Sequence, residues 1–272
     1  MIKIDNALLS KLILCFFFFT TEIYADDVVL IQSTTSIRDS GFYRYILDEY
    51  KKESSVVIKV IAVGTGQAIK NSKNCDADLL FVHHEPSERK FVDNGFGLYR
   101  KEVMYNDYVL IGPDKDPANI KFKKSIKVAL QIIYNGKYPF VSRGDNSGTH
   151  MKERELWSLI KREVGSKKTK WYFESGSGMG SSLNLAVNID GYIISDRSTW
   201  ISFGNKKNHI VLVQNEPLLK NYYGIIPISP FNCPNVNVKE AEKFISWLTS
   251  KRGKRLINEF KVNNSQIFFT RD

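Results

Sequence analysis

The chain has 272 residues, of which 43% are hydrophobic, 25% are charged and 12% are aromatic. This composition is that of a globular protein and excludes intrinsic disorder and a disulfide-dense miniprotein. The 39 Lys and Arg residues outnumber the 29 Asp and Glu residues. The resulting net charge of +10 suits a small anion, an acidic surface or nucleic acid, and does not choose among them. Three cysteines are too few for a four-cysteine zinc site.

The first 25 residues have the features of a secretory signal peptide. Lys3 and Lys11 accompany an apolar stretch, residues 12–19, that is too short to span a bilayer. Ala25 is the small residue that a cleavage site requires. We therefore expect residues 1–25 to be removed and the mature chain to be a soluble periplasmic protein.

The first part of the mature chain alternates strand and helix patterns. Apolar and β-branched runs predict strands at residues 28–31, 56–63, 77–82 and 103–112. Helical spacing follows the first two strands, from Phe42 to Tyr50 and from Gln67 to Lys73. Small polar or Gly-rich turns therefore connect strand to helix.

The same alternation continues to the end of the chain. Strands are predicted at residues 139–142, 171–173 and 191–195. Apolar helix faces are predicted at residues 156–164 (closed by Gly165), 183–187, 241–248 and 254–260. Alternating strands and helices predict an α/β architecture with largely parallel sheets. No Pro-rich linker is present, so two domains would be interleaved or tightly joined.

Three small-residue clusters stand where a strand gives way to a helix. Unpaired N–H groups and a positive macrodipole at a helix N-terminus bind oxyanions, hydroxyls add donors, and glycine lets the backbone approach closely. Any one such cluster is more often a plain turn or cap, but three at strand ends lie where α/β proteins bind ligands. The three clusters are Ser33–Ser36, Gly64–Gly66 and Ser147–Thr149. Together with Arg143 they provide the candidate ligand-binding residues, which are Ser33, Thr34, Thr35, Ser36, Gly64, Thr65, Gly66, Arg143, Ser147, Gly148 and Thr149.

Arg143 supplies a planar guanidinium that fits an oxyanion edge. Asp145, two residues further on, has two possible roles: it can pair with Arg143 and hold the guanidinium, or it can cap the following helix.

Enzyme chemistry is the competing class of function. In a secreted hydrolase, Ser147 would be the nucleophile, His150 the base and Asp145 the orienting carboxylate. The sequence does not, however, show a complete base–nucleophile pair. The turn at residues 176–180 lacks the GxSxG order of a nucleophile elbow. The segment His83-His84-Glu85 has no metal-ligand spacing, which favours a structural or surface role. We therefore expect no catalytic residues, no metal site and no cofactor.

The basic residues are dispersed along the chain. Short runs occur at residues 121–124, 167–168 and 251–255. Such dispersion favours solvated faces over a nucleic-acid stripe. We expect no nucleic-acid partner. The two cysteines of the mature chain, Cys75 and Cys233, are either bridged or separate thiols, and their spacing does not decide which.

Taken together, several motifs resemble the periplasmic tungstate-binding receptors of bacterial ABC importers, over essentially the whole mature chain. The segments that carry the resemblance are Ser33–Ser36 with Asp39–Gly41, Val63–Ala68, Asp76–His83, Val103–Asp107 with Ile111–Pro113, and Ser142–His150. Two departures are Ser33, where the family usually has Thr, and His84-Glu85, where Ala is common before Pro86.

The resemblance implies a type II periplasmic binding protein fold, with two α/β lobes joined by two crossover strands and the ligand in the cleft. The first lobe would combine residues 26–105 and 223–272, and the second would be residues 106–222. Thr34 and Arg143 match the principal ligand positions of the family. The implied function is a monomeric, non-enzymatic receptor that delivers tungstate to a membrane permease.

The chemistry of the candidate donors leaves several anions open. Tungstate ranks first by resemblance, molybdate has nearly the same size and charge, and phosphate or sulfate ranks third. Tungstate and molybdate are fully deprotonated at neutral pH and offer only acceptors. An inward-facing carboxylate would suit a protonated anion such as phosphate instead. The orientation of Asp145 therefore separates these hypotheses.

Overall fold

A computed structural model gives the structure of residues 28–271, apart from residues 124, 163 and 166–168. The predicted signal peptide, residues 1–25, lies outside the described residues. Within the described part of the chain, no helix is long and apolar enough to cross a membrane.

The chain folds into two α/β lobes that share one nine-stranded sheet, with strand order β2-β1-β3-β9-β4-β7-β5-β6 and β8 beside β4. The first lobe contains β1 (Val28–Thr34), β2 (Val57–Val63), β3 (Leu79–Val82), β9 (Lys220–Pro227), α1 (Thr35–Asp39), α2 (Phe42–Tyr50), α3 (Thr65–Lys73), α4 (Glu85–Asp93), α9 (Val238–Leu248), α10 (Lys251–Glu259), β10 (Lys261–Val262) and β11 (Ser265–Gln266). The second lobe contains β5 (Phe140–Ser142), β6 (Tyr172–Glu174), β7 (Tyr192–Asp196), β8 (His209–Val213), α5 (Ile126–Gly136), α6 (Gly148–Ser158), α7 (Met179–Asn188), α8 (Arg197–Ser202) and the 3-10 turn η1 (Pro217–Leu219).

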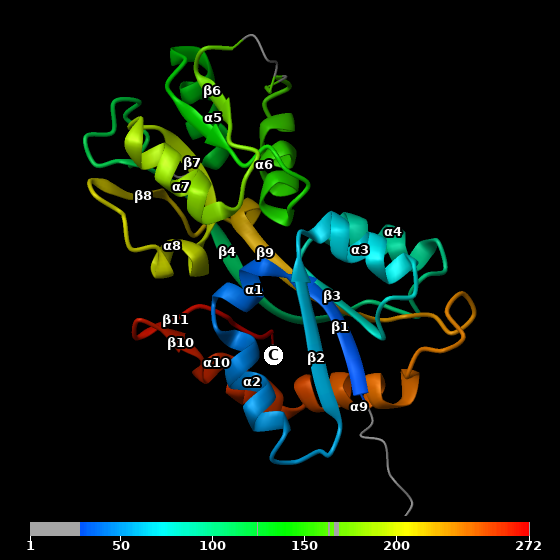
Figure 1. Cartoon of the computed structure of the whole chain (residues 1–272). Coiled ribbons are helices and arrows are strands. Elements are labelled where there is room, and N and C mark those ends of the chain that lie inside the picture. Colours follow the sequence, from blue (N-terminus) through cyan, green and yellow to red (C-terminus); the bar gives the residue numbers. More distant parts are fainter. Residues whose placement is uncertain (1–27, 124, 163, 166–168, 272) are drawn as a thin grey trace, which may run out of the picture.

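Two strands join the lobes. The first half of β4 (Lys101–Pro113) pairs with β9 in antiparallel fashion, with Tyr105 opposite Tyr222. The second half of β4 pairs with β7, where Tyr108 lies opposite Asp196, and with β8. Figure 1 shows β4 and β9 running between the two groups of elements. The predicted architecture, two α/β lobes with two crossover strands, is confirmed.

Each lobe is a sheet covered by helices on both faces. In the first lobe, apolar side chains of α2, α9 and α10 pack on one face, and those of α3 and α4 pack on the other. In the second lobe, α5 and α6 cover one face and α7 and α8 cover the other. The sheet is mixed rather than largely parallel as predicted, because β9 pairs antiparallel with β3 and β4, and β4 pairs antiparallel with β7 and β8. The alternation of strands and helices along the chain does not reveal the direction of these crossover strands.

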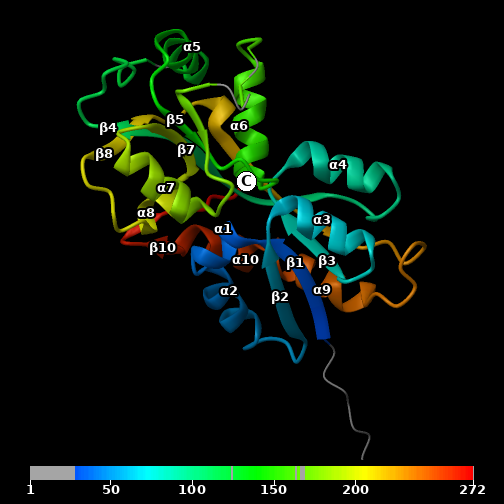
Figure 2. The same ribbon diagram turned by 45° about the horizontal axis from the view of Figure 1, so that its top comes forward.

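The strand register brings the predicted turns together. β1 pairs in parallel with β2 over its full length, so that Thr34 is level with Val63. The turns after both strands therefore lie at the same edge of the sheet. In the second lobe, Ser142 at the end of β5 is level with Glu174 at the end of β6. Figure 2 shows α6 reaching toward α3 across the space between the lobes.

Several elements differ from the sequence-based prediction. Helices α4 and α5 and strand β8 were not predicted, although Ile126, Leu130 and Ile133 of α5 have helical spacing and are buried. Helix α6 ends at Ser158 rather than continuing to Val164. The reason is local, because the backbone N–H groups of residues 159–161 bond three residues back rather than four.

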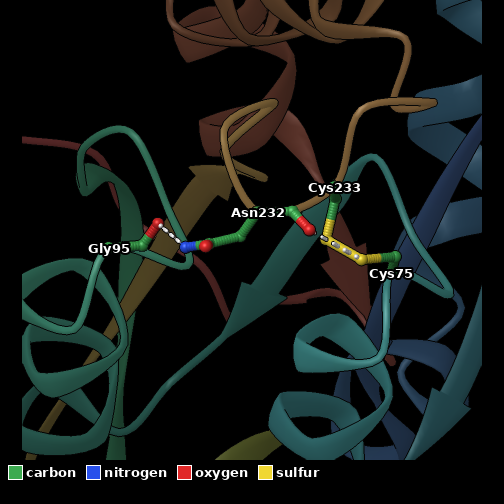
Figure 3. Close-up of a disulfide and its surroundings, with 4 residues drawn as sticks. All are labelled: Cys75, Gly95, Asn232 and Cys233. Carbon is green, nitrogen blue, oxygen red and sulfur yellow. Dashed lines mark hydrogen bonds between the residues drawn. A yellow bond between two sulfur atoms is a disulfide. The ribbon is translucent and has the colours of Figure 1, made fainter.

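The structure contains a disulfide between Cys75 and Cys233, a pairing that the sequence left open. The bond ties the turn after α3 to the loop after β9, across 158 residues of chain (Figure 3). The adjacent Asn232 side chain donates to the backbone oxygen of Gly95 at 2.8 Å. Both contacts lie within the first lobe, on loops that approach its sheet from the end opposite the carboxyl ends of β1 and β2.

Candidate functional site: an interlobe cleft lined by unpaired donors

The first lobe contributes two helix N-termini to the cleft. Helix α1 begins at Thr35 with Thr34 as its N-cap, and α3 begins at Thr65 with Gly64 as its N-cap. Neither N-cap side chain bonds the helix. The N–H groups of both first turns therefore have no intrahelical or capping acceptor.

The second lobe contributes Arg143 and the N-terminus of α6. Arg143 follows β5 directly, and α6 begins at Gly148 after the N-cap Ser147. The N–H of Gly66 donates to the oxygen of Asn146 at 3.3 Å, which joins the two lobes. A Cβ placed on Gly148 would lie 2.9 Å from Oγ1 of Thr65. The structure thus brings together the three turns that the sequence identified.

A cavity of about 340 Å³ lies between these turns. Four predicted residues line it, namely Thr35, Ser36, Gly64 and Arg143. The other seven do not, and they are Ser33, Thr34, Thr65, Gly66, Ser147, Gly148 and Thr149. The further lining residues are Arg38, Asp39, Asp145, Gly178, Met179, Gly180, Ser181 and Thr199. Larger cavities of about 550 and 460 Å³ lie beside the crossover strands and contain none of the three turns. The sequence interpretation missed residues 178–181, although the signal was present, because a Gly-rich turn also precedes a helix there.

Four of the predicted side chains are buried with a polar atom that has no hydrogen-bond partner in the described part of the chain. These atoms are Oγ1 of Thr34, Thr65 and Thr149 and Nε of Arg143. The four residues are between 0% and 6% exposed. Burying a polar group without a partner is costly, and most buried polar groups are paired. Of the four residues, Arg143 lines the cavity, and the three threonines belong to the three turns. Unpaired donors on these turns favour a ligand that accepts hydrogen bonds.

Asp145 is held by its own lobe. Its Oδ2 accepts from Nη2 of Arg143 at 2.7 Å. Its Oδ1 accepts from the backbone N and the Oγ of Ser147, at 3.2 and 2.5 Å. Although Asp145 lines the cavity, both carboxylate oxygens are engaged, so the carboxylate faces Arg143 and fixes its guanidinium.

Two predicted hydroxyls are not available to a ligand. Ser33 donates to the oxygen of Phe81 at 2.7 Å and accepts from the Tyr43 hydroxyl at 2.5 Å. Side chains alternate along a strand, so Ser33 and Thr34 point to opposite faces of the sheet, and Oγ1 of Thr34 has no hydrogen-bond partner among the described residues. Ser147 donates to Asp145 and accepts from the N–H of His150 at 3.2 Å, which makes it the cap of α6.

The hydrolase arrangement is not formed. The Ser147 hydroxyl donates to the Asp145 carboxylate rather than to an imidazole. Nδ1 of His150 contacts the backbone oxygen of Asp145, and burial lowers the pKa of this histidine. The proposed Ser–His pair needs the imidazole within hydrogen-bond reach of the hydroxyl, and among the described residues no hydrogen bond joins the His150 ring to Ser147. The described residues also contain no group of three or more His, Cys, Asp or Glu side chains able to hold a metal ion.

His83 is part of the junction between the lobes. Its Nδ1 lies 3.1 Å from the Tyr108 hydroxyl on β4 and 3.0 Å from Oδ1 of Asn221 on β9. Burial lowers the pKa of His83 to about 4, so the ring is neutral at pH 7. His84 instead contacts Ser87 at 2.7 Å within α4. The two neighbouring histidines thus have separate, structural environments.

Comparison with known proteins identifies the family. Residues 22–252 match the family model described as the PBP superfamily domain. The tungstate-binding protein TupA of Peptoclostridium acidaminophilum is 40% identical over 87% of this chain and 82% of its own length. The chain therefore belongs to the PBP superfamily and, within it, to the family of the tungstate-binding proteins.

Solved structures agree with this assignment. The tungstate-binding protein TupA from Desulfovibrio alaskensis G20 superposes with a TM-score of 0.80 at 37% identity, covering 89% of this chain and 98% of that one. A structure described as the tungstate ABC transporter from Geobacter sulfurreducens gives a TM-score of 0.77 at 39% identity, covering 87% of this chain and 100% of that one. The predicted periplasmic binding protein fold is confirmed.

Proposed function

We propose that this protein is a periplasmic receptor that binds tungstate in the interlobe cleft and delivers it to an ABC importer. The names of its relatives support tungstate as the ligand and a transporter as the destination. In this proposal the protein catalyses no reaction and needs no cofactor, because the anion itself is the cargo. The mature chain acts as a monomer after removal of residues 1–25.

The observation that carries the proposal is the set of unpaired donors in the cleft. Tungstate offers only acceptor oxygens and two negative charges. Thr34, Thr65 and Thr149 would donate hydroxyls and Arg143 its Nε. Further donors would be the N–H groups at the first turns of the helices, from Thr35, Ser36 and Gly148, whereas the N–H of Gly66 already donates to Asn146. Ser33 and Ser147 would support the site without donating their hydroxyls.

The state of Asp145 favours a fully deprotonated anion. A carboxylate turned toward the ligand would repel tungstate or molybdate and would accept a proton from phosphate. Both Asp145 oxygens are instead engaged by Arg143 and Ser147. Molybdate remains the alternative ligand of the same class, and phosphate and sulfate rank below both.

We also propose that the lobes pivot between residues 105 and 106 and between residues 222 and 223. The first lobe is then residues 26–105 with 223–272, and the second is residues 106–222. In support, Tyr105 and Tyr222 lie opposite each other in the β4–β9 pair. Closure around the anion would give the permease a liganded shape to recognise.

Calorimetric titration of the desalted mature protein tests the proposal. We expect one-to-one binding of tungstate, similar binding of molybdate, and no heat with phosphate or sulfate. An ester-hydrolysis assay with wild type and Ser147→Ala tests the enzyme alternative, and we expect no turnover from either. Absence of both heat and thermal stabilisation with every anion would overturn the proposal, because a ligand that binds only the native state must stabilise it.

A further inference from the structure

We propose that the first turn of α7, residues 178–181, is a fourth part of the anion site and donates backbone N–H groups to the ligand. The inference rests on the proposed function and extends it to an element that the sequence interpretation dismissed. Helix α7 begins at Met179, and its N-cap Gly178 is extended, with φ −63° and ψ 163°. Gly178 has no side chain to cap the helix, so the first-turn N–H groups have no acceptor within α7.

A second observation points to an anion at the same place. The cavity that residues 178–181 line is also lined by Arg143. Arg143 is 6% exposed, and its Nε has no hydrogen-bond partner within the residues that the structure describes. A buried cation with an unpaired donor and the positive end of a ten-residue helix therefore share one space. Both attract negative charge. Asp145 pairs with Nη2 of Arg143 and leaves Nε for a ligand, and no side chain caps the helix.

The turn that carries these donors is fixed to Arg143. The backbone N of Ser175 donates to the oxygen of Ser142 at 2.9 Å. The Ser175 hydroxyl lies 3.2 Å from the oxygen of Arg143 and 2.7 Å from the Ser182 hydroxyl in α7. The start of α7 is thus bonded to the backbone of the residue that supplies the cation. Such support holds two groups of donors in one geometry.

The glycines of the turn leave its backbone open. A Cβ on Gly178 or Gly180 would meet no atom within 4 Å. Close packing therefore does not require glycine at either position. The absence of side chains exposes the N–H groups to the cavity. The other charged pair that lines the cavity is self-contained, because Nε of Arg38 bonds Asp39 at 2.8 Å.

The first test places a negative charge at this helix end. Ser181, the third residue of α7, is exposed and lines the cavity. Ser181→Asp suits the helix, because acidic residues stabilise a first turn, but it opposes the anion. We expect Ser181→Asp to bind tungstate about a hundredfold more weakly than the neutral Ser181→Asn. Val128→Asp is the matched control, because it adds the same charge at the third, exposed position of α5, away from the cavity.

The second test removes one N–H group. Proline is tolerated at the first position of a helix, where Met179 stands, and the extended Gly178 before it is compatible with proline. Met179→Ala deletes the same side chain and keeps the N–H. We expect Met179→Pro to bind tungstate about tenfold more weakly than Met179→Ala.

Both tests use calorimetric titration with sodium tungstate. A difference in tungstate affinity between Ser181→Asp and Ser181→Asn, or between Met179→Pro and Met179→Ala, supports donation from α7. Equal affinities within each pair, in a wild-type protein that binds tungstate, would overturn this inference and leave the proposed function intact. A wild-type protein that does not bind tungstate would overturn both.

Discussion

Nη2 of Arg143 lies 2.7 Å from Oδ2 of Asp145, whereas Nε of the same guanidinium has no partner among the described residues. The carboxylate thus holds one edge of the guanidinium and leaves another donor for a ligand. A buried Arg can therefore be held in place by one nitrogen and still offer another nitrogen as a hydrogen-bond donor.

Removal of this cation should weaken binding strongly. Arg143→Ala leaves a buried anion without its buried cation, and truncating one partner of such a pair costs roughly 2–5 kcal/mol. Calorimetry should therefore show a dissociation constant for tungstate that rises by about thirtyfold or more. Arg89→Ala, which removes an exposed cation paired with Glu85 in α4, is the control and should bind as wild type does. Unchanged affinity in Arg143→Ala would place the site elsewhere.

The neighbouring residues Ser33 and Thr34 should respond in opposite ways to substitution. Thr34→Ala removes an unpaired hydroxyl, so we expect affinity for tungstate to fall by roughly 1.5–3 kcal/mol with no loss of stability in the absence of ligand. Ser33→Ala breaks the bonds to Phe81 and Tyr43, so we expect lower stability, by about 1–3 kcal/mol, and little change in affinity.

Urea unfolding and calorimetry, applied to both variants, check this contrast. Thr34→Ser, which keeps the hydroxyl, should restore most of the binding. A Ser33→Ala variant that loses affinity more than Thr34→Ala would show that the roles of the two residues are reversed.

A side chain at Gly148 should interfere with contact between the lobes. A Cβ there would lie 2.6 Å from Cε1 of His83 and 2.9 Å from Oγ1 of Thr65. Both distances are below van der Waals contact, and both neighbours belong to the first lobe. We expect Gly148→Ala to weaken tungstate binding by about tenfold or more. Gly204→Ala is a steric control, because its Cβ would meet nothing within 4 Å and Gly204 does not line the cavity. Equal affinity of Gly148→Ala and wild type would mean that the lobes do not need this approach.

Protonation of His83 should destabilise the protein in mild acid. Burial lowers the pKa of His83 from 6.5 to about 4 in the folded state. Between these pH values the unfolded chain binds more protons than the native one, so stability falls as the pH drops through this window and the loss is complete below about pH 4. The total contribution is about 3 kcal/mol.

Comparison with His83→Gln isolates this effect. Other groups titrate nearby with the opposite sign, because burial raises the pKa of Glu153 to about 7 and stabilises the native state more at low pH. These groups contribute equally to both proteins, so the difference in unfolding free energy between wild type and His83→Gln should shrink from pH 6.5 to pH 4. A difference that stays constant over this range would show that His83 is not held neutral by the fold.

The sequence by itself determined the α/β class, the two-lobed family fold and the three turns of the cleft. These features are local or repeated: apolar runs predict strands, and small polar residues after them predict helix N-termini. The family resemblance depended on the same segments. The sequence also identified Arg143 as the cation, because it stands beside one of those turns.

The tertiary structure alone decided which of these polar groups are paired within the protein and which are left without a partner among the described residues. On β1, the hydroxyl of Ser33 bonds Phe81 and Tyr43, whereas the hydroxyl of the adjacent Thr34 has no partner among the described residues. Three further features were not encoded locally in the chain. Asp145 bonds Arg143, a disulfide joins Cys75 to Cys233, and the start of α7 lines the same cavity as Arg143. Spacing along a sequence shows which residues share an element, whereas contact between elements is set by the burial of their apolar faces.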